Sequence, residues 1–198
     1  MKKIIAASNN KNKIHEIKKI LDGSGYEVIS LKEAGVDIDP EENSDTFEGN
    51  ALIKARAAAS LLSGMIIADD SGLAVNCLDG KPGVKSKRFA GPGAGDSDNN
   101  AYLIEQLKKK SCNDYNARFI CVIALIDNNG REYTFKGSCE GEIRFVPICS
   151  NGFGYDPHFY VPEFQKTMAQ LSDTEKNSIS HRGNALKKLK MFLEGLNK

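Results

Sequence analysis

The sequence has no excess of charge of either sign. It holds 27 lysine and arginine residues against 26 aspartate and glutamate residues, which gives a formal net charge of +1 at pH 7 over 198 residues. Proteins that attract nucleic acid or an anionic membrane through their overall field carry a basic excess. We therefore expect neither nucleic acid nor a membrane as a partner, and any phosphate site must be built from a few local residues.

Long apolar runs are also missing. The run at 4–7, behind two lysines, is too short for a signal peptide, and no stretch approaches the roughly 20 residues of a membrane-spanning helix. We expect a soluble, cytoplasmic protein. Its length fits one domain, residues 1–198, with room for two lobes.

Paired cysteine motifs are absent as well. The number of cysteines is odd and no two of them form a CxxC pair, which argues against both a disulfide framework and a zinc site. We therefore expect reduced cysteines that serve as packing residues. The five are Cys77, Cys112, Cys121, Cys139 and Cys149.

The apolar residues that are present predict alternating strands and helices. Residues 3–7 are typical of a short buried strand, and the apolar residues of 14–21 recur at helical spacing. The segment 118–135 contains an Asn-Asn-Gly turn between two strand-like runs, which predicts an antiparallel hairpin. Alternating elements followed by antiparallel strands indicate an α/β protein with a mixed sheet.

A polar segment follows the first predicted strand and opens the first predicted helix. Backbone N–H groups at a helix N-terminus bind anions, so we interpret the segment as a candidate phosphate site. It lacks the glycines of GxxxxGK[ST] and of GxGxxG, which excludes a Walker loop and a dinucleotide fingerprint. A helix cap with solvated lysines is the alternative, because Ser and Asn are favoured caps. The segment consists of Ser8, Asn9, Asn10, Lys11, Asn12 and Lys13.

Two acidic pairs could hold a magnesium ion. Asp69 and Asp70 follow a predicted strand, 65–68, that is expected to end at them, and Glu41 and Glu42 lie in a loop. Carboxylates suit Mg²⁺, which usually takes a few of them together with substrate phosphates and water. Neighbouring strand residues point to opposite faces, so only one of Asp69 and Asp70 should face the site. Solvated or capping carboxylates are the alternative.

One lysine and a glycine-rich segment add two further candidates. Lys54 shares a helical face with Asn50 and could reach a phosphate, although a surface lysine is the simpler interpretation. The segment 152–157 offers aromatic faces at Phe153 and Tyr155 and an acceptor at Asp156, which is how a base is bound by stacking and edge hydrogen bonds. Aromatic residues that fill the core are the alternative.

The last candidate stands at or before the start of the final predicted helix. Lys176, His181 and Arg182 supply three potentially cationic donors there, which suit a carbonyl or phosphate oxygen. Ordinary neighbours of a helix cap are the alternative.

In this order the segments resemble the inosine triphosphate pyrophosphatase family, also described as dITP/XTP or aberrant-purine pyrophosphatases. The resemblance spans nearly the whole chain. Its motifs are SNNKNKIHE at 8–16, TFEGNA at 46–51 with Lys54-Ala55, ADDSGL at 68–73, PGV at 82–84 with Ser86 and Arg88, GFGYDP at 152–157, and Glu175-Lys176 with SHRG at 180–183.

The resemblance implies an activity, a fold and a set of site residues. The activity is hydrolysis of ITP, dITP and XTP to the monophosphate and pyrophosphate, on an elongated mixed sheet flanked by helices, with a cleft between two lobes. Mg²⁺ would be held by Glu42 and Asp70, Asp70 would also be the proton acceptor, and the protein would be a homodimer. The residues implied to contact the purine triphosphate are Ser8, Asn9, Asn10, Lys11, Asn12, Lys13, Lys54, Ser71, Phe153, Gly154, Tyr155, Asp156, Lys176, His181 and Arg182.

The sequence departs from the family pattern at two positions. A glycine is common where Asn9 stands, and Asn9 can adopt a left-handed backbone conformation at modest cost. An acidic residue is common where Gly49 stands, so one carboxylate is missing, and Glu41 could substitute for it beside Glu42.

Two alternative functions remain open. One is a pyrophosphatase for other modified nucleotides, such as methylated pyrimidines, and the other is a nucleotide- or RNA-binding module without turnover. The near-neutral charge and the lack of an extended basic stripe argue against the binding module.

Overall fold

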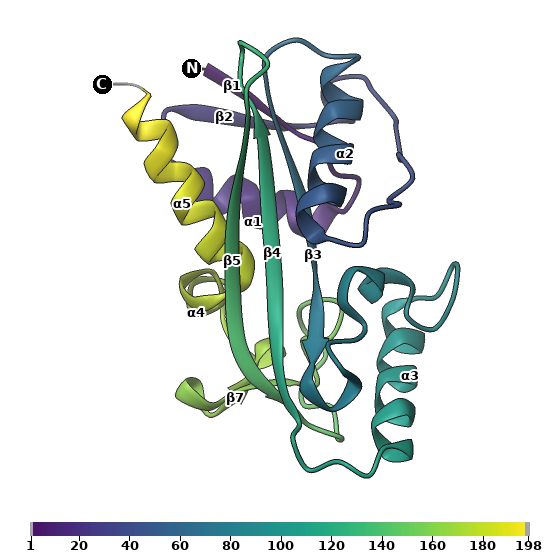
Figure 1. Ribbon diagram of the computed structural model, residues 1–198. Helices are drawn as coiled ribbons and strands as arrows, with labels where there is room; N and C mark the ends of the chain where they lie inside the picture. The colour runs from purple at the N-terminus through teal and green to yellow at the C-terminus, as the bar shows by residue number, and fades with distance from the viewer. Residues whose placement is uncertain (1, 197–198) are drawn as a thin grey trace. The chain divides into compact units, whose positions relative to one another are not determined.

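The computed structural model describes residues 2–196, which form a seven-stranded sheet with helices packed on it (Figure 1). The strand order is β2-β1-β3-β4-β5-β6-β7. Pairing is parallel between β1 and both β2 and β3, and antiparallel between β5 and β6 and between β6 and β7. The predicted α/β fold with a mixed sheet is therefore confirmed.

Strands and helices alternate from β1 to α3, as the sequence predicts for the first part of the chain. The strands are β1 Lys2–Ala6, β2 Tyr26–Ser30, β3 Met65–Val75, β4 Asn116–Ile126, β5 Glu132–Ile143, β6 Phe159–Val161 and β7 Lys166–Thr167. The α-helices are α1 Lys11–Leu21, α2 Phe47–Ala59, α3 Asp96–Lys109, α4 Asp173–Ile179 and α5 His181–Gly195.

The chain divides into two compact units. Of the described residues, the first unit comprises 2–70, 121–137 and 181–196, and the second comprises 71–120 and 138–180. The boundaries fall within or beside strands β3, β4 and β5, so each of these strands contributes residues to both units. A single domain with two lobes, as expected from the sequence, stays a prediction.

In the first unit, helices cover both faces of the sheet, and this arrangement decides where side chains of β3 point. Helices α1 and α5 pack in one cluster with Ile4 of β1 and Ile67 of β3. Helix α2 packs in another cluster with Ile5 and Ala68, the neighbours of those two residues (Figure 1). Because successive strand residues alternate between faces, a strand buried on both sides is apolar at every position.

Strand β3 continues well beyond the predicted end at residue 68. It runs through the polar residues 69–72 to Val75, so the expectation that it stops at Asp69 was wrong. The polar residues and the glycine at 69–72 are typical of a turn, which is why the strand was expected to end there. The carboxylates of Asp69 and Asp70 are instead neutralised by basic side chains from several helices, and the strand continues.

The core of the second unit forms around α3. Leu103 and Leu107 of this helix pack with Leu73 and Val75 of β3 and with Phe159 of β6. The cluster also holds Tyr155, from the glycine-rich segment, so this segment is anchored in the core of its unit.

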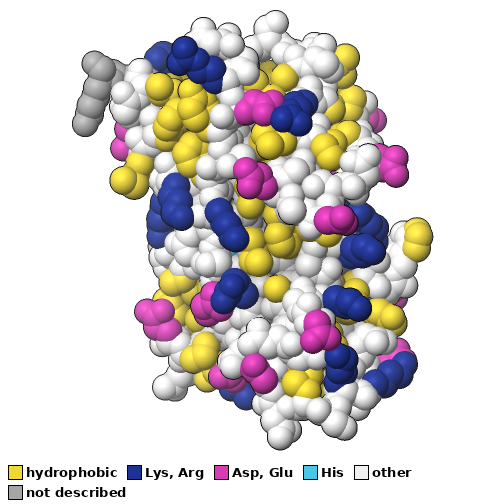
Figure 2. All heavy atoms as spheres, in the orientation of Figure 1, with side chains coloured by type: hydrophobic (Ala, Val, Ile, Leu, Met, Phe, Trp, Pro, Cys, Tyr) yellow, Lys and Arg dark blue, Asp and Glu magenta, His cyan; other side chains and the backbone are white. Residues whose placement is uncertain are grey.

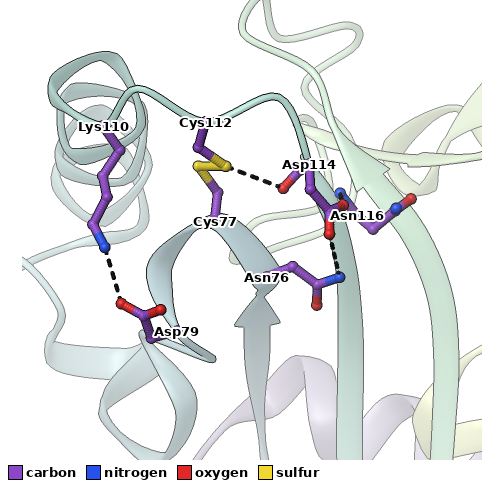
Figure 3. Close-up of a disulfide and its surroundings, with 7 residues drawn as sticks. All are labelled: Asn76, Cys77, Asp79, Lys110, Cys112, Asp114 and Asn116. Carbon is purple, nitrogen blue, oxygen red and sulfur yellow. Dashed lines mark hydrogen bonds and ion pairs between the residues drawn. A yellow bond between two sulfur atoms is a disulfide. The ribbon is translucent and has the colours of Figure 1, made fainter.

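Two of the five cysteines are joined, which corrects the expectation that all are reduced. Cys77 lies in a short 3₁₀ turn after β3, and Cys112 lies between α3 and β4; they form a disulfide with a Cα–Cα distance of 5.9 Å (Figure 3). Ion pairing of Lys110 with Asp79, at 2.9 Å, links the same two segments. Cys121 and Cys139 are free and buried, as expected, whereas Cys149 is free and exposed.

Removing this disulfide should destabilise the protein measurably. The cysteines are 35 residues apart, and a cross-link closing such a loop contributes roughly 3–4 kcal/mol in the chain-entropy model. We expect the double variant Cys77→Ala/Cys112→Ala to unfold at lower denaturant than the wild type under non-reducing conditions, and a Cys149→Ser control to match the wild type. Reaction of all five thiols, instead of three, in the denatured unreduced protein would rule out the disulfide.

None of the helices within residues 2–196 combines the length and the apolar character needed to cross a membrane. On the face drawn in Figure 2, basic and acidic side chains are interspersed.

Candidate active site

The polar segment 8–13 forms the turn that joins β1 to α1. Asn10 is the N-cap of α1, and its side-chain Oδ1 accepts hydrogen bonds from the backbone N–H groups of Asn12, at 2.9 Å, and Lys13, at 3.2 Å. The Oγ of Ser8 accepts from the backbone N–H of Asn10 at 3.2 Å. The helix-cap interpretation is therefore correct for Asn10, while Asn9, Lys11 and Asn12 are exposed beside it.

The backbone of Asn9 takes no left-handed conformation. Among the described non-glycine residues, positive φ occurs at Asp79, Cys149 and Gln165. The side chain of Asn9 donates instead to the carbonyl of Ile38 at 2.9 Å, which ties the turn to a neighbouring loop. The turn thus forms without the glycine that is common at this position.

Lys54 joins two of the predicted carboxylates on the α2 face of the sheet. Its Nζ lies 2.8 Å from Oδ1 of Asp70 and 3.3 Å from Oε1 of Glu42. Asp70 projects from β3 toward α2, and Glu42 comes from the loop that precedes this helix. The simpler interpretation of Lys54 as a solvated surface lysine is wrong, because the side chain is largely buried between two acids.

The electrostatics of this cluster are set mainly by burial. Desolvation raises the pKa of Asp70 to about 6, against the opposing attraction of Lys54. For Lys54, desolvation is the largest influence and by itself lowers the pKa, but the charges of Asp70 and Glu42 outweigh it and the net shift is upward. Asp70 is therefore a carboxyl whose protonation changes near neutral pH, a property common in catalytic groups.

The cluster can accept a divalent cation. Asp70 Oδ2 is buried, and no donor among residues 2–196 forms a hydrogen bond with it. A buried oxygen without a donor is costly unless something else satisfies it, and carboxylate oxygens are the preferred ligands of Mg²⁺. Within the described part of the chain no group of three or more metal-binding side chains converges, so a cation here would take Glu42 and Asp70 together with oxygens from substrate and water.

Glu41 and Gly49 can be judged against this geometry. Glu41 is exposed, whereas Glu42 is partly buried and reaches Lys54, so the structure favours Glu42 of the two. A side chain at position 49 would collide with Ser44. The glycine therefore fits the local packing, and no carboxylate is supplied from this position.

Asp69 points to the other face of the sheet and takes part in a separate group of ion pairs. Its carboxylate contacts Nζ of Lys13 and, at 3.0 Å, Nε of Arg182. Arg182 also pairs with Glu16 of α1. The expectation that Asp69 and Asp70 face opposite sides is confirmed.

Arg182 and His181 open α5 and are both buried. The guanidinium of Arg182 is 1% exposed and is held between Asp69 and Glu16, whose charges raise its pKa further above the usual range against the effect of burial. Contact of these two residues with a base stays a prediction, and Arg182 pairs with two carboxylates. Ser71, the residue after Asp70 in β3, is half-buried.

In the second unit, the glycine-rich segment brings together most of the predicted base-binding residues. Asp156 Oδ2 accepts from Lys176 Nζ at 2.7 Å and from the backbone N–H of Phe153 at 3.0 Å. The same Nζ lies 4.6 Å from the centroid of the Phe153 ring. The half-buried Phe153 ring is thus held by a buried ion pair, with Lys176 supplied by α4, a helix that the sequence analysis did not predict.

Tyr155 fills the core, as the alternative interpretation stated. Its ring is buried, and its hydroxyl donates to the carbonyl of Ser86 at 2.8 Å. Burial raises the pKa of Tyr155 far above its usual range, so the phenol stays protonated. Tyr155 therefore anchors the glycine-rich segment in the core of the second unit.

Sequence reasoning missed the residues that hold this segment against α3. Asp96 Oδ2 accepts from the backbone N–H of Gly154 at 2.6 Å, and Asn100 Nδ2 donates to the carbonyl of Gly154 at 2.8 Å. The two side chains are four residues apart, so they lie on one face of the helix. That spacing is the only sequence signal that could have pointed to them.

The chain is an α/β protein with a mixed sheet, in which carboxylates of β3 pair with lysines of α1 and α2. Comparison with known proteins identifies the family. The Ham1 family model matches residues 4–192. The dITP/XTP pyrophosphatase of Clostridium perfringens is 46% identical, with 99% of each chain covered, and that of Staphylococcus epidermidis is 47% identical, with 98% of each covered. This chain therefore belongs to the Ham1 family.

Solved structures agree with this assignment. The Ham1 protein of Staphylococcus aureus superimposes with a TM-score of 0.87 at 46% identity, covering 98% of this chain and all of that one. A HAM1 protein from Coxiella burnetii gives a TM-score of 0.90 at 43% identity with the same coverage.

Proposed function

We propose that this chain is a nucleoside-triphosphate pyrophosphatase that hydrolyses the aberrant purine nucleotides ITP, dITP and XTP to the monophosphate and pyrophosphate. The observation that carries the proposal is similarity over nearly the full length to proteins named dITP/XTP pyrophosphatase, in a chain whose Lys54, Asp70 and Glu42 form one buried cluster. The reaction would cleanse the nucleotide pool of bases that mispair.

The first unit supplies the groups for the triphosphate. Lys13 and Lys54 each carry a charge suited to phosphate oxygens, and the turn with Ser8 and Asn10 lies at the N-terminus of α1, where the helix dipole favours an anion. Asn9, Lys11 and Asn12, exposed on the same turn, complete the set. Positioning and charge stabilisation of this kind supply most of the acceleration in phosphoryl transfer.

Glu42 and Asp70 are proposed to hold Mg²⁺, which when bound would neutralise charge on the phosphate oxygens and orient them. The proposal is supported by the buried oxygen of Asp70 that lacks a hydrogen-bond donor among the described residues. Both carboxylates also share one cationic neighbour, the Lys54 ammonium, so they already lie close to the same point.

Asp70 is also proposed to accept the proton of the attacking water. A general base must be within reach of the water and ionised at the working pH. Burial raises the pKa of Asp70 to about 6 in the absence of metal, and the charge of a bound Mg²⁺ would lower it, so the carboxylate is ionised at neutral pH. The activated water would attack the α-phosphorus, and pyrophosphate would leave with its charge balanced by Lys13 and Lys54.

The second unit supplies the groups for the base. The Phe153 ring offers a stacking face, while Asp156, Lys176 and the Gly154 backbone surround it. His181 and Arg182 of the first unit are proposed to contact the purine edge, and Ser71 the substrate. A donor at the 6-position can donate a hydrogen bond to an oxo group, whereas the amino group of adenine is itself a donor and would leave a polar group unmatched at roughly 1–3 kcal/mol.

The first experiment measures pyrophosphate release from dITP, XTP, dGTP, dATP and dTTP, with Mg²⁺ and then with a chelator. We expect metal-dependent release of pyrophosphate that strongly favours dITP and XTP. Preference for modified pyrimidines would support the rival pyrophosphatase, and binding without any cleavage would support the non-catalytic module.

From the family resemblance we also propose a cytoplasmic homodimer. Light scattering of the purified protein should give twice the 21.6 kDa of one chain. A monomeric mass at micromolar concentration would count against the dimer.

A further inference from the structure

Asp69 has no role in the mechanism described above, although it is next to the proposed base and is 2% exposed. A buried charge is expensive unless it is fully paired, so its retention in the middle of β3 calls for an explanation. All of its contacts named below come from elements of the first unit.

Both oxygens of the Asp69 carboxylate are occupied. Oδ1 pairs with Lys13 Nζ, and Oδ2 accepts from Arg182 Nε and from Cys121 Sγ, each at 3.0 Å. These partners come from α1, α5 and β4. Each oxygen of Asp69 thus has a donor, whereas Oδ2 of Asp70 has none among the described residues.

The ion pairs form a series that leads from buried side chains to a more exposed one. Glu16 and Asp69 enclose Arg182, whose side chain is 1% exposed, and Asp69 continues the series to Lys13, whose side chain is 17% exposed. Lys13 is thus the member of this series most open to solvent. Arg182 fixes one oxygen of Asp69, and the other oxygen is presented to Lys13.

We propose that Asp69 is a positioning residue that holds the Lys13 ammonium in place to bind phosphate at the start of α1. A free lysine side chain has about 2 kcal/mol of rotamer entropy, and fixing it in advance reduces the cost of binding. The inference rests on the proposed function in one respect, namely that Lys13 binds the triphosphate.

The variant Asp69→Asn separates positioning from simple charge. If the asparagine turns its amide N–H₂ toward Lys13, donor faces donor and Lys13 is displaced. If it turns the N–H₂ toward Arg182 and Cys121, Lys13 keeps only a neutral oxygen as its partner and is held less firmly. The loss of a negative charge acts in the opposite direction, because it raises the local positive potential and by itself would tighten anion binding. The sign of the change in affinity therefore decides between the two effects.

The test is a double-mutant cycle of Asp69→Asn and Lys13→Ala, measured as the affinity for inorganic tripolyphosphate by calorimetry and as kcat and KM with dITP. We expect Asp69→Asn to weaken tripolyphosphate binding about tenfold and to cause no further loss in the Lys13→Ala protein. Equal losses in both backgrounds, tighter binding, or no binding by the wild type would overturn the proposal. Failure of dITP hydrolysis alone would instead remove the proposed function, because tripolyphosphate binding needs no turnover.

A matched control and a second measurement protect the test against misfolding. Glu132→Gln removes a carboxylate of the same unit from an exposed pair with Arg56. It should leave the affinity for tripolyphosphate and the KM for dITP unchanged. If Asp69→Asn does not fold, lysine ammonium NMR of the wild type decides, with Lys13→Ala used for assignment. An ammonium signal of Lys13 protected from exchange supports the positioning role, and rapid exchange like that of exposed lysines overturns it.

Discussion

Replacing Asp70 by asparagine should reduce turnover of dITP by about a thousandfold or more, because the change removes the proposed base and a proposed metal ligand together. Asparagine keeps the size of the side chain and its contact with Lys54, so the fold and the lysines that bind phosphate should persist. We expect nucleotide binding, measured by calorimetry in the absence of metal, to change less than tenfold. Turnover near the wild-type level would remove Asp70 from the mechanism.

The same variant should also be more stable than the wild type at pH 7 without divalent cations. Burial raises the pKa of Asp70 from 3.8 to about 6, so the folded state binds this proton more tightly than the unfolded state. Between about pH 4 and 6 stability therefore falls as pH rises, and at pH 7 the ionised carboxylate costs on the order of 2–3 kcal/mol. Asparagine has no proton to lose and avoids this cost.

Urea unfolding at pH 7 and pH 5 measures both parts of this expectation. The wild type should gain stability from this group as the pH is lowered, and Asp70→Asn should gain less. Asp39→Asn, at an exposed position, is the matched control and should change neither activity nor stability by more than about 0.5 kcal/mol. A variant less stable than the wild type at pH 7 would show that the pair with Lys54 outweighs desolvation.

The part of the fold that follows from local pattern was predictable. The segments 3–7 and 118–126 are mainly apolar and flanked by turn or helix signals, and they coincide with most of β1 and most of β4. The stretches 4–6 of β1 and 65–68 of β3 are apolar at every position because α1 and α5 cover one face and α2 the other. These strands could therefore be predicted from the residues of each segment alone.

What failed depended on partners distant in the chain. Asp69 was assigned to the end of a strand because polar residues usually break one, yet Arg182, 113 residues away, neutralises it inside β3. Cys77 and Cys112 were assigned as reduced, since no spacing rule links cysteines that far apart, and only the packing of their unit brings them within bonding distance. The alternation of Asp69 and Asp70 was predictable, but which of the two would meet Lys54 was not.

The candidate site was predictable as a set of residues and less so as a set of interactions. Lys54 alone was indistinguishable from a surface lysine, because its burial between Glu42 and Asp70 is a tertiary property. In the same way Tyr155 could be assigned to the base or to the core with equal reason, and its hydrogen bond to Ser86 decides for the core.

Replacing Arg182 by methionine should destabilise the protein by about 3–5 kcal/mol, because it leaves the carboxylates of Asp69 and Glu16 with too little positive charge to balance their burial. The effect should depend on pH with a definite sign: Arg182 lowers the pKa of the buried Asp69 against the effect of desolvation, so without it that pKa rises in the folded state and the variant should recover stability as the pH falls from 7 toward 5. Arg56→Met is the matched control, since it breaks an exposed pair with Glu132 that contributes about 1 kcal/mol or less. Urea unfolding of both variants across this pH range measures the difference. If Arg182→Met kept wild-type stability and lost only selectivity for 6-oxopurines, the main role of Arg182 would be to bind the base. Its buried ion pairs would then contribute little to the free energy of unfolding.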